Sequence, residues 1–251
     1  MRQIIKKSVF LLLLVAFAGS VAHAVSDYKL LGEKASRFVQ FQEWRSALAM
    51  YELMLDQRPQ EILPYARGIV VSGVLNDTTM QTDLMQRTQK YAIPLDSLFT
   101  HVRDYAFSVG QSQQYVDFLT LVKKRQPWIA RNIDLQLLSF YTFRNDAPNM
   151  IKTGTYLLQS TPDNVEYLNA VAKGYLLEGK YSEAMERYRQ IVTFDPENYD
   201  ALLVLGNYYN GISAKDPSVK VDAIKYLEAA YNLRPTPFVA NTIKKLKQRP
   251  K

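Results

Sequence analysis

Few side chains in this sequence could carry out acid–base, nucleophilic or metal chemistry. The chain contains two histidines, His23 and His101, and no cysteine, so it offers no Cys–His pair and no thiolate ligand for a metal ion. A single histidine without a partner that tunes its pKa is more often structural than catalytic. Glu183 and Glu186 are three residues apart, but carboxylates on an outer helix face are nearly always solvated, because only burial or a neighbouring charge raises their pKa. We therefore expect no enzyme activity, no cofactor and no metal ion.

The first 24 residues have the three parts of a secretory signal peptide. A basic start with Arg2, Lys6 and Lys7 precedes an apolar run over residues 9–22, and an Ala-His-Ala sequence ends at Ala24. The run is shorter than the roughly 20 residues of a membrane-spanning helix. We expect cleavage after Ala24 and an exported, periplasmic protein without stable membrane insertion; the alternative is retention as an anchor. Because the chain has no cysteine for lipid attachment, a lipoprotein is excluded.

The charge of the chain does not favour a nucleic-acid partner. Loss of the first 24 residues would lower the formal net charge from +7 to +4. Nucleic-acid-binding proteins usually concentrate lysine and arginine on one face, whereas here these residues are dispersed. The basic stretch over residues 242–251 is interpreted as a solvated final helix.

Six prolines that each follow an amphipathic run are nearly evenly spaced. The gaps between them are 35, 33, 35, 34 and 39 residues. Since proline cannot continue a helix and keeps the preceding residue out of the helical region, each one would end a unit. A period near 34 residues indicates an array of helical hairpins. The prolines are Pro59, Pro94, Pro127, Pro162, Pro196 and Pro235.

The unit from Val165 to Asn198 resembles the tetratricopeptide repeat. It places large, small and aromatic residues in its first half, a glycine at the turn, and a small residue, an aromatic residue and a proline in its second half. These residues are Leu168, Val171, Ala172, Tyr175, Gly179, Ala184, Tyr188 and Pro196. The next unit repeats the pattern with Leu202, Leu205, Gly206, Tyr209, Ala223, Leu227, Ala230 and Pro235. The first unit carries the pattern with Leu31, Ala35, Phe38, Trp44, Ala47, Tyr51 and Pro59. The three units over residues 62–164 are looser, with Tyr115 where a small residue is expected and no turn glycine in "RNDAPN".

The resemblance implies an all-α, right-handed superhelical solenoid of about six antiparallel helix pairs over residues 25–251. The expected repeats cover residues 28–61, 62–95, 96–129, 130–164, 165–198 and 199–237. Each pair would bury its apolar face against its neighbours, and a capping helix over residues 238–247 would close the array. In this cap we expect Phe238, Val239, Ile243 and Leu246 to face the core.

The resemblance also implies a concave groove lined by the first helix of each repeat. Amides, single charges and a few large apolar side chains lie at the corresponding positions, a composition suited to an extended peptide or a partner helix. For Phe107, Phe143 and Leu177, packing between neighbouring first helices is the alternative. The candidate partner-binding residues are Asp104, Phe107, Asn132, Leu135, Ser139, Phe143, Glu166, Asn169, Lys173, Leu177, Asp200, Asn207 and Asn210.

These features predict a non-enzymatic adaptor or scaffold that binds other proteins in the bacterial cell envelope. The alternative is a structural, self-assembling repeat subunit without a peptide-binding groove, and a homo-oligomer is compatible with either function. Both functions are inferred from fold and surface composition, because no residue cluster assigns a reaction.

Overall fold

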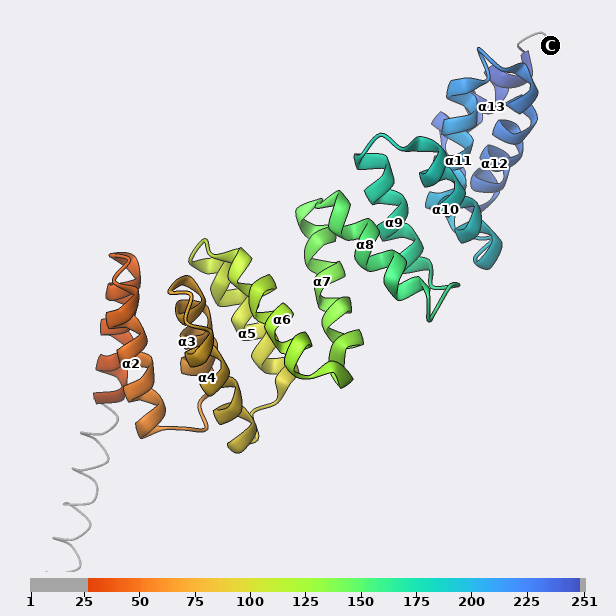
Figure 1. Ribbon diagram of the computed structural model, residues 1–251. Coiled ribbons are helices and arrows are strands. Elements are labelled where there is room, and N and C mark those ends of the chain that lie inside the picture. Colours follow the sequence, from red (N-terminus) through yellow and green to blue (C-terminus); the bar gives the residue numbers. More distant parts are fainter. Residues whose placement is uncertain (1–26, 249–251) are drawn as a thin grey trace, which may run out of the picture. The chain divides into compact units, whose positions relative to one another are not determined.

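The computed structural model describes residues 27–248 (Figure 1). The predicted signal peptide and its cleavage site lie outside this range. Within it every regular element is helical and no strand occurs, which confirms the all-α prediction. The chain divides into two compact units, with the division between Pro127 and Trp128, and each unit is described by itself. The handedness of a superhelix through both units therefore stays a prediction.

The first unit consists of helical hairpins packed in chain order. Helical residues 27–40 precede the labelled helices (Figure 1). Helix α3 packs against α2, α4, α5 and α6, and its buried residues include Tyr65 and Ile69. Tyr115, which occupies a position where a small residue was expected, is buried, and this burial raises the pKa of its hydroxyl to about 12. The helices are α2 (Trp44–Gln57), α3 (Ile62–Val74), α4 (Thr78–Lys90), α5 (Leu95–Ser108) and α6 (Ser112–Arg125).

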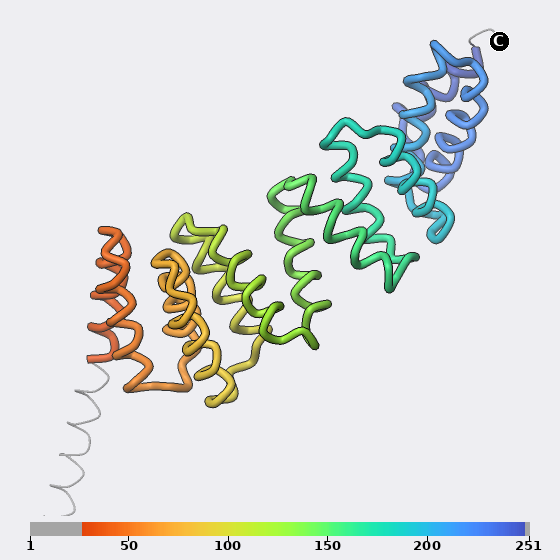
Figure 2. Tube along the Cα trace, viewed as in Figure 1, coloured from red at the N-terminus to blue at the C-terminus, as the bar shows by residue number. Residues whose placement is uncertain are grey.

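The second unit repeats the same arrangement more regularly. Helix α9 packs between α8 and α10, and α11 packs between α10 and α12, as the tube in Figure 2 shows. The last helix, α13, packs against α12. The elements are η1 (Pro127–Ile129), which spans the division, then α7 (Ala130–Arg144), α8 (Ala147–Leu158), α9 (Val165–Leu177), α10 (Tyr181–Phe194), α11 (Tyr199–Ile212), η2 (Pro217–Val219), α12 (Lys220–Leu233) and α13 (Pro237–Gln248).

A residue in the left-handed backbone conformation lies at the turn inside each of the first five hairpins. Gly110 and Gly179 both have φ +72°, and glycine adopts this conformation without steric cost. Asn145 has φ 52° in the "RNDAPN" turn, so an asparagine replaces the expected glycine there. The five residues recur every 34 or 35 positions, which makes the turn a repeated element of the chain. They are Gln42, Asn76, Gly110, Asn145 and Gly179.

Side-chain caps begin several of the helices. The carboxylates of Asp77 and Asp146 accept hydrogen bonds from backbone N–H groups in the first turns of α4 and α8. The amide oxygens of Asn164 and Asn198 do the same for α9 and α11. These bonds satisfy donors that a helix N-terminus leaves unpaired, and each is typically worth about 1 kcal/mol.

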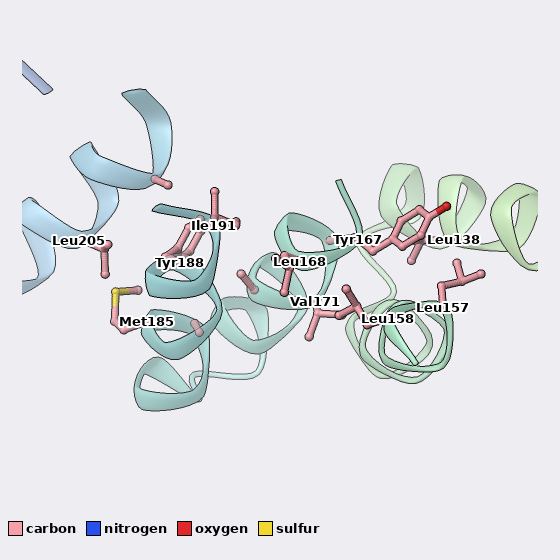
Figure 3. Close-up of a cluster of buried hydrophobic side chains, with 14 residues drawn as sticks. Leu138, Leu157, Leu158, Tyr167, Leu168, Val171, Met185, Tyr188, Ile191 and Leu205 are labelled. Carbon is pink, nitrogen blue, oxygen red and sulfur yellow. The ribbon is translucent and has the colours of Figure 1, made fainter. Parts of the chain in front are cut away.

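Small residues allow the helices of the second unit to approach closely. Ala172 and Ala184 are fully buried within the cluster drawn in Figure 3, together with Leu168, Val171 and Tyr188. A Cβ atom added at Gly206 would lie 2.7 Å from Cγ of Leu227 on α12. A side chain at Gly206 would therefore displace Leu227, so α11 and α12 cross closely there.

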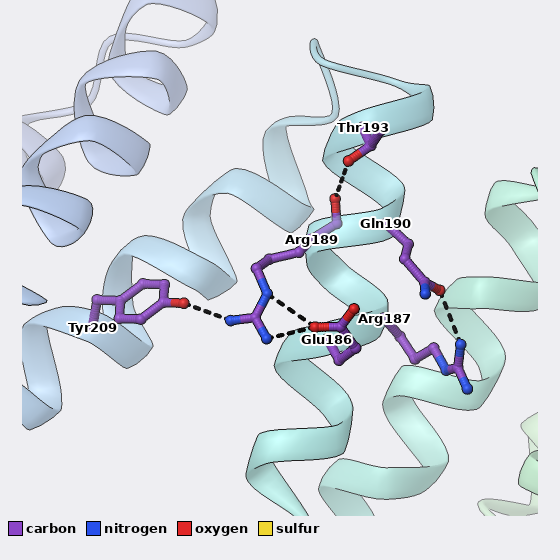
Figure 4. A network of polar contacts seen from close by, with 6 residues as sticks. All are labelled: Glu186, Arg187, Arg189, Gln190, Thr193 and Tyr209. Carbon is purple, nitrogen blue, oxygen red and sulfur yellow. Dashed lines mark hydrogen bonds and ion pairs between the residues drawn. The ribbon is translucent and has the colours of Figure 1, made fainter.

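Arg189 links α10 to α11 (Figure 4). Its guanidinium donates from Nη1 to the Tyr209 hydroxyl at 2.7 Å and from Nη2 to Oε2 of Glu186 at 2.6 Å. The Tyr209 ring stacks on Tyr226 of α12 with 5.8 Å between ring centroids, and it packs against buried residues on both sides. Tyr209 thus packs between successive hairpins.

The final helix differs from the prediction at one residue. Val239 and Leu246 are buried and Ile243 is partly buried against α12, but the side chain of Phe238 is 66% exposed. The prediction for Phe238 was wrong because successive helical residues point about 100° apart, so adjacent Phe238 and Val239 cannot both face a narrow contact.

Candidate functional site

An open groove of about 830 Å³ lies between the first helices α7 and α9 of the second unit. Both helices pack against α8, which holds them apart. The lining residues come from α7, from Asn145, which directly follows α7, and from α9. They are Leu135, Leu138, Ser139, Thr142, Phe143, Asn145, Glu166, Tyr167, Asn169, Ala170 and Lys173.

The floor of the groove is apolar. Leu138, Tyr167 and Ala170 are buried there, and all three belong to the core cluster around α8, α9 and α10. Leu135 packs against the same cluster while remaining half-buried. The methyl side chain of Ala170 occupies little of the space between the helices, so the groove stays open above a rigid, packed base.

The rim of the groove is polar and charged, apart from one aromatic ring. Ser139 on α7 and Glu166, Asn169 and Lys173 on α9 are exposed, and the Phe143 side chain is 72% exposed. Since α9 rises 1.5 Å per residue, Glu166 and Lys173 are about 10 Å apart along the helix. The groove therefore has one negative and one positive site along α9, with the Asn169 amide between them.

Six of the thirteen predicted partner-binding residues line this groove. They are Leu135, Ser139, Phe143, Glu166, Asn169 and Lys173. Phe143 and Leu177, for which packing between first helices was the alternative, are 72% and 49% exposed. Leu177 nevertheless lies outside the groove lining.

The other predicted residues are not brought to this groove. Asn132 is exposed near the start of α7, while Asp200 and Asn207 are exposed and Asn210 is half-buried on α11. Asp104 and the half-buried Phe107 belong to α5 in the first unit, where Asp104 forms an ion pair with the neighbouring Arg103 at 2.9 Å. Sequence reasoning missed five lining residues, three of which, Leu138, Tyr167 and Ala170, are buried in the core. The five are Leu138, Thr142, Asn145, Tyr167 and Ala170.

The groove offers amide, apolar and charged groups to a ligand. Within residues 27–248 no three His, Asp or Glu side chains are grouped so that they could hold a metal ion. The side-chain amide of Asn169 can donate and accept hydrogen bonds at once, as an extended peptide backbone requires. The apolar floor can take one or two hydrophobic side chains, and the two rim charges can pair with opposite charges.

Between residues 27 and 248, none of the helices combines the length and the apolar character needed to cross a bilayer.

Comparisons with known proteins give matches among solved structures. No protein-family model and no curated protein matches the chain. The chain is similar to tetratricopeptide-repeat proteins. The C-terminal part of such a protein from Cytophaga hutchinsonii is 13% identical, with a TM-score of 0.46, and the match covers 80% of this chain and 78% of that one.

Two further matches are of the same kind. A TPR protein from Bacteroides fragilis is 14% identical, with a TM-score of 0.37 and coverage of 88% of this chain and 97% of its own. The TPR2AB domain of yeast Sti1, in its complex with pHSP90, is 12% identical, with a TM-score of 0.36 and coverage of 89% and 99%. These proteins belong to the family that the repeat of this chain resembles.

Proposed function

We propose that this chain is a non-enzymatic adaptor that binds an extended segment of another protein in the groove between α7 and α9. The observation that carries the proposal is the combination of a buried apolar floor with an exposed polar rim, at residues that belong to two successive hairpins. Protein interfaces have this composition, with an apolar centre that is desolvated on binding and a polar edge.

The groove suggests how a segment would be held. An apolar side chain of the ligand would lie over Leu138, Tyr167 and Ala170, which are packed in the core cluster beneath the groove. The Asn169 amide would hydrogen-bond the ligand backbone. Lys173 and Glu166 would pair with an acidic and a basic ligand residue, respectively, and so set the direction in which the segment binds.

We place this adaptor in the bacterial cell envelope, on the basis of the signal-like residues 1–24. The protein purified from the periplasmic fraction of an expressing bacterium is expected to begin at Val25, as intact mass and N-terminal sequencing would establish. Recovery with Met1 in a salt-resistant membrane fraction would instead identify a retained anchor.

The binding proposal is tested by site-specific photo-crosslinking in envelope extracts. A photoreactive amino acid at Ser139, on the rim, is expected to crosslink a partner. The same group at Lys152, which is exposed on α8 and does not line the groove, is the matched control. Mass spectrometry of the Ser139-specific product identifies the partner and the segment of it that binds.

The role of the rim residues is then measured with that partner segment. Asn169→Ala combined with Lys173→Ala should weaken binding by about tenfold or more, because truncation leaves polar groups of the ligand unsatisfied at ~1–3 kcal/mol each. The melting temperature should hardly change, since exposed substitutions are usually neutral within about 0.5 kcal/mol. Asn207→Ala, an exposed asparagine outside the groove, should leave affinity unchanged.

Two outcomes would reject the groove. If the stable Asn169→Ala, Lys173→Ala variant binds normally, the binding site lies outside the groove between α7 and α9. A Ser139 crosslink that joins two copies of this chain would support the self-assembling structural subunit instead.

A further inference from the structure

Three side chains of α9 form one row along the rim of the groove between α7 and α9. Glu166, Asn169 and Lys173 are separated by three and four residues, a spacing that places side chains on the same face of a helix. All three are exposed and line the groove. The row presents a carboxylate, an amide and an ammonium group, with about 10 Å along the helix axis between the two charged residues.

The two charges of this row are not paired inside the protein. On the neighbouring helix α10, Glu186 and Arg189 are three residues apart and form an ion pair at 2.6 Å (Figure 4). Glu166 and Lys173 are seven residues apart, whereas ion pairs on a helix surface form at a separation of three or four. Within residues 27–248, neither of them forms an ion pair. Both charges are therefore available to a ligand.

The uncharged polar side chains of the groove are available as well. Ser139, Thr142, Asn145 and Asn169 line it, and their side chains form no hydrogen bond to another described residue. The backbone of a helical ligand could not use these groups, because its N–H and C=O groups already bond to each other. A segment without internal hydrogen bonds keeps its backbone groups free for them. The lining therefore favours a non-helical ligand.

The distance between the two charges distinguishes the non-helical conformations. On one side of a β-strand, side chains recur after two or four residues, which span about 7 or 13 Å. In a polyproline II segment they recur after three residues, which span about 9 Å. This last value is the nearest to the separation of Glu166 and Lys173, which is about 10 Å.

The remaining surfaces of the groove suit proline rings. Leu138, Tyr167 and Ala170 form the apolar floor, and the Phe143 side chain on the α7 rim is 72% exposed. Proline-rich segments dock in aromatic-lined grooves, and they lose little entropy on binding because the polyproline II conformation forms before they bind. The lining residues from α7 carry no charge, so the charged residues of a ligand would face α9.

We propose that the groove between α7 and α9 binds a proline-rich segment in the polyproline II conformation, with a basic and an acidic residue three positions apart. The basic residue would pair with Glu166 and the acidic residue with Lys173, while the residues between them lie over the floor. The Asn169 amide would donate a hydrogen bond to a ligand carbonyl. This inference rests on the proposed function, which requires only that the groove bind a segment of another protein.

The spacing is tested with three fluorescent peptides of identical composition. Each consists of prolines with one lysine and one glutamate, placed two, three or four positions apart, and has uncharged ends. Proline keeps all three in the polyproline II conformation. Binding to the whole protein is followed by fluorescence anisotropy. The peptide with a spacing of three should bind at least tenfold more tightly than the other two, because it alone turns both charges toward α9.

Reversal of one charge on each partner locates the peptide. Lys173→Glu should weaken binding of the spacing-three peptide at least tenfold, and a peptide with lysine in place of its glutamate should regain affinity for this variant. A merely structural role of Lys173 would not give this recovery. Lys152→Glu, at an exposed residue of α8 outside the groove lining, is the matched control and should change affinity by no more than about twofold. Circular dichroism melting confirms that each variant is folded.

Three results would overturn the ligand class. Equal affinity for the three spacings, or no binding by any of them, would reject the polyproline II conformation. Tighter binding by an alanine-rich helical peptide, with its lysine and glutamate seven positions apart, would identify a helix as the ligand. Failure of the reversed peptide to bind the Lys173→Glu variant would place the ligand away from α9.

The crosslink at Ser139 separates this failure from that of the proposed function. If Ser139 captures a partner segment that lacks proline and this charge spacing, the groove remains a binding site and only the ligand class is wrong. If no peptide binds and Ser139 captures no partner, both proposals are rejected.

Discussion

Gly206 and Gly211 lie on the same helix, α11, in different surroundings. A Cβ atom at Gly206 would approach the Leu227 side chain to 2.7 Å and its backbone nitrogen to 3.1 Å, whereas a Cβ atom at Gly211 meets nothing within 4 Å. We predict that Gly206→Ala lowers the free energy of unfolding by about 1–3 kcal/mol, because the buried Leu227 cannot move away. Gly211→Ala should raise it by up to about 1 kcal/mol through helix propensity. Urea unfolding measures both changes, and shifts in the same direction would contradict the α11–α12 packing.

The environment of Glu52 on α2 predicts that the stability of the first unit depends on pH. Partial burial raises the pKa of its carboxyl, against the opposing effect of Arg87, and nearby Asp56 and Asp83 add to the rise. Because the folded state holds the proton more tightly, this group's contribution to stability is full below the unfolded pKa. It is lost as pH rises through the folded pKa.

Glu52→Gln should therefore stabilise the protein more at about pH 7 than at about pH 4, by a difference of roughly 0.5 kcal/mol or less because the group is partly exposed. Urea unfolding of the variant and the unsubstituted protein at the two pH values measures this difference in stabilisation. A larger gain at low pH would mean that pairing with Arg87 outweighs burial.

At the scale of the elements, the turn inside each of the first five hairpins depends on one residue with positive φ. Gly179, at φ +72°, has no atoms within 4 Å of an added Cβ, so substitution there changes backbone strain alone. We predict that Gly179→Ala costs about 1–2 kcal/mol of stability and that Gly179→Asn costs less, because asparagine tolerates this conformation as Asn145 does in the equivalent turn. Thermal melting ranks the two variants against the unsubstituted protein. Equal melting temperatures for the alanine and asparagine variants would show that the turn changes conformation.

Much of the hairpin architecture could be predicted from spacing. Leu168, Ala172 and Ala184 were assigned to the core from their positions in the repeat, and all are buried. The positive-φ residues of the turns were harder to predict, because Gln42 and Asn145 take the place of glycine there and neither residue type requires that conformation. The backbone conformation at such positions is imposed by the packing of the two flanking helices. It therefore cannot be predicted from the neighbouring residues in the sequence alone.

The groove could be predicted only in part for a related reason. First-helix positions point to one side, and Glu166, Asn169 and Lys173, chosen from such positions, line the same groove. Whether a hollow forms depends on the volumes of side chains on two helices at once. The small Ala170 leaves space beside α7, while exposed Asn207 on α11 lines no described hollow. The repeat register predicts which side of a helix a residue faces. Whether a cavity forms on that side depends on how the particular side chains of the two helices pack.

At the scale of the whole molecule, the division between Pro127 and Trp128 separates two helical arrays that differ in packing. The clusters around Leu168 and Leu227 draw their buried residues from positions 138–246, all within the second unit. A unit that contains its own core should fold without the other. Residues 128–251 include both α7 and α9, so the proposed binding groove would be complete in this fragment.

We predict that residues 128–251, expressed alone, are helical and unfold cooperatively in urea. The slope of this transition should be about half that of a single transition of the 25–251 chain, because the slope scales with the surface exposed on unfolding. The fragment should also bind the crosslinked partner segment with the affinity of the full chain, within about twofold, since the buried floor residues Leu138, Tyr167 and Ala170 keep their neighbours. A fragment that is helical but melts without a transition would mean that α7 depends on the first unit for its packing. Cooperative folding combined with lost binding would instead place part of the ligand contact before Trp128.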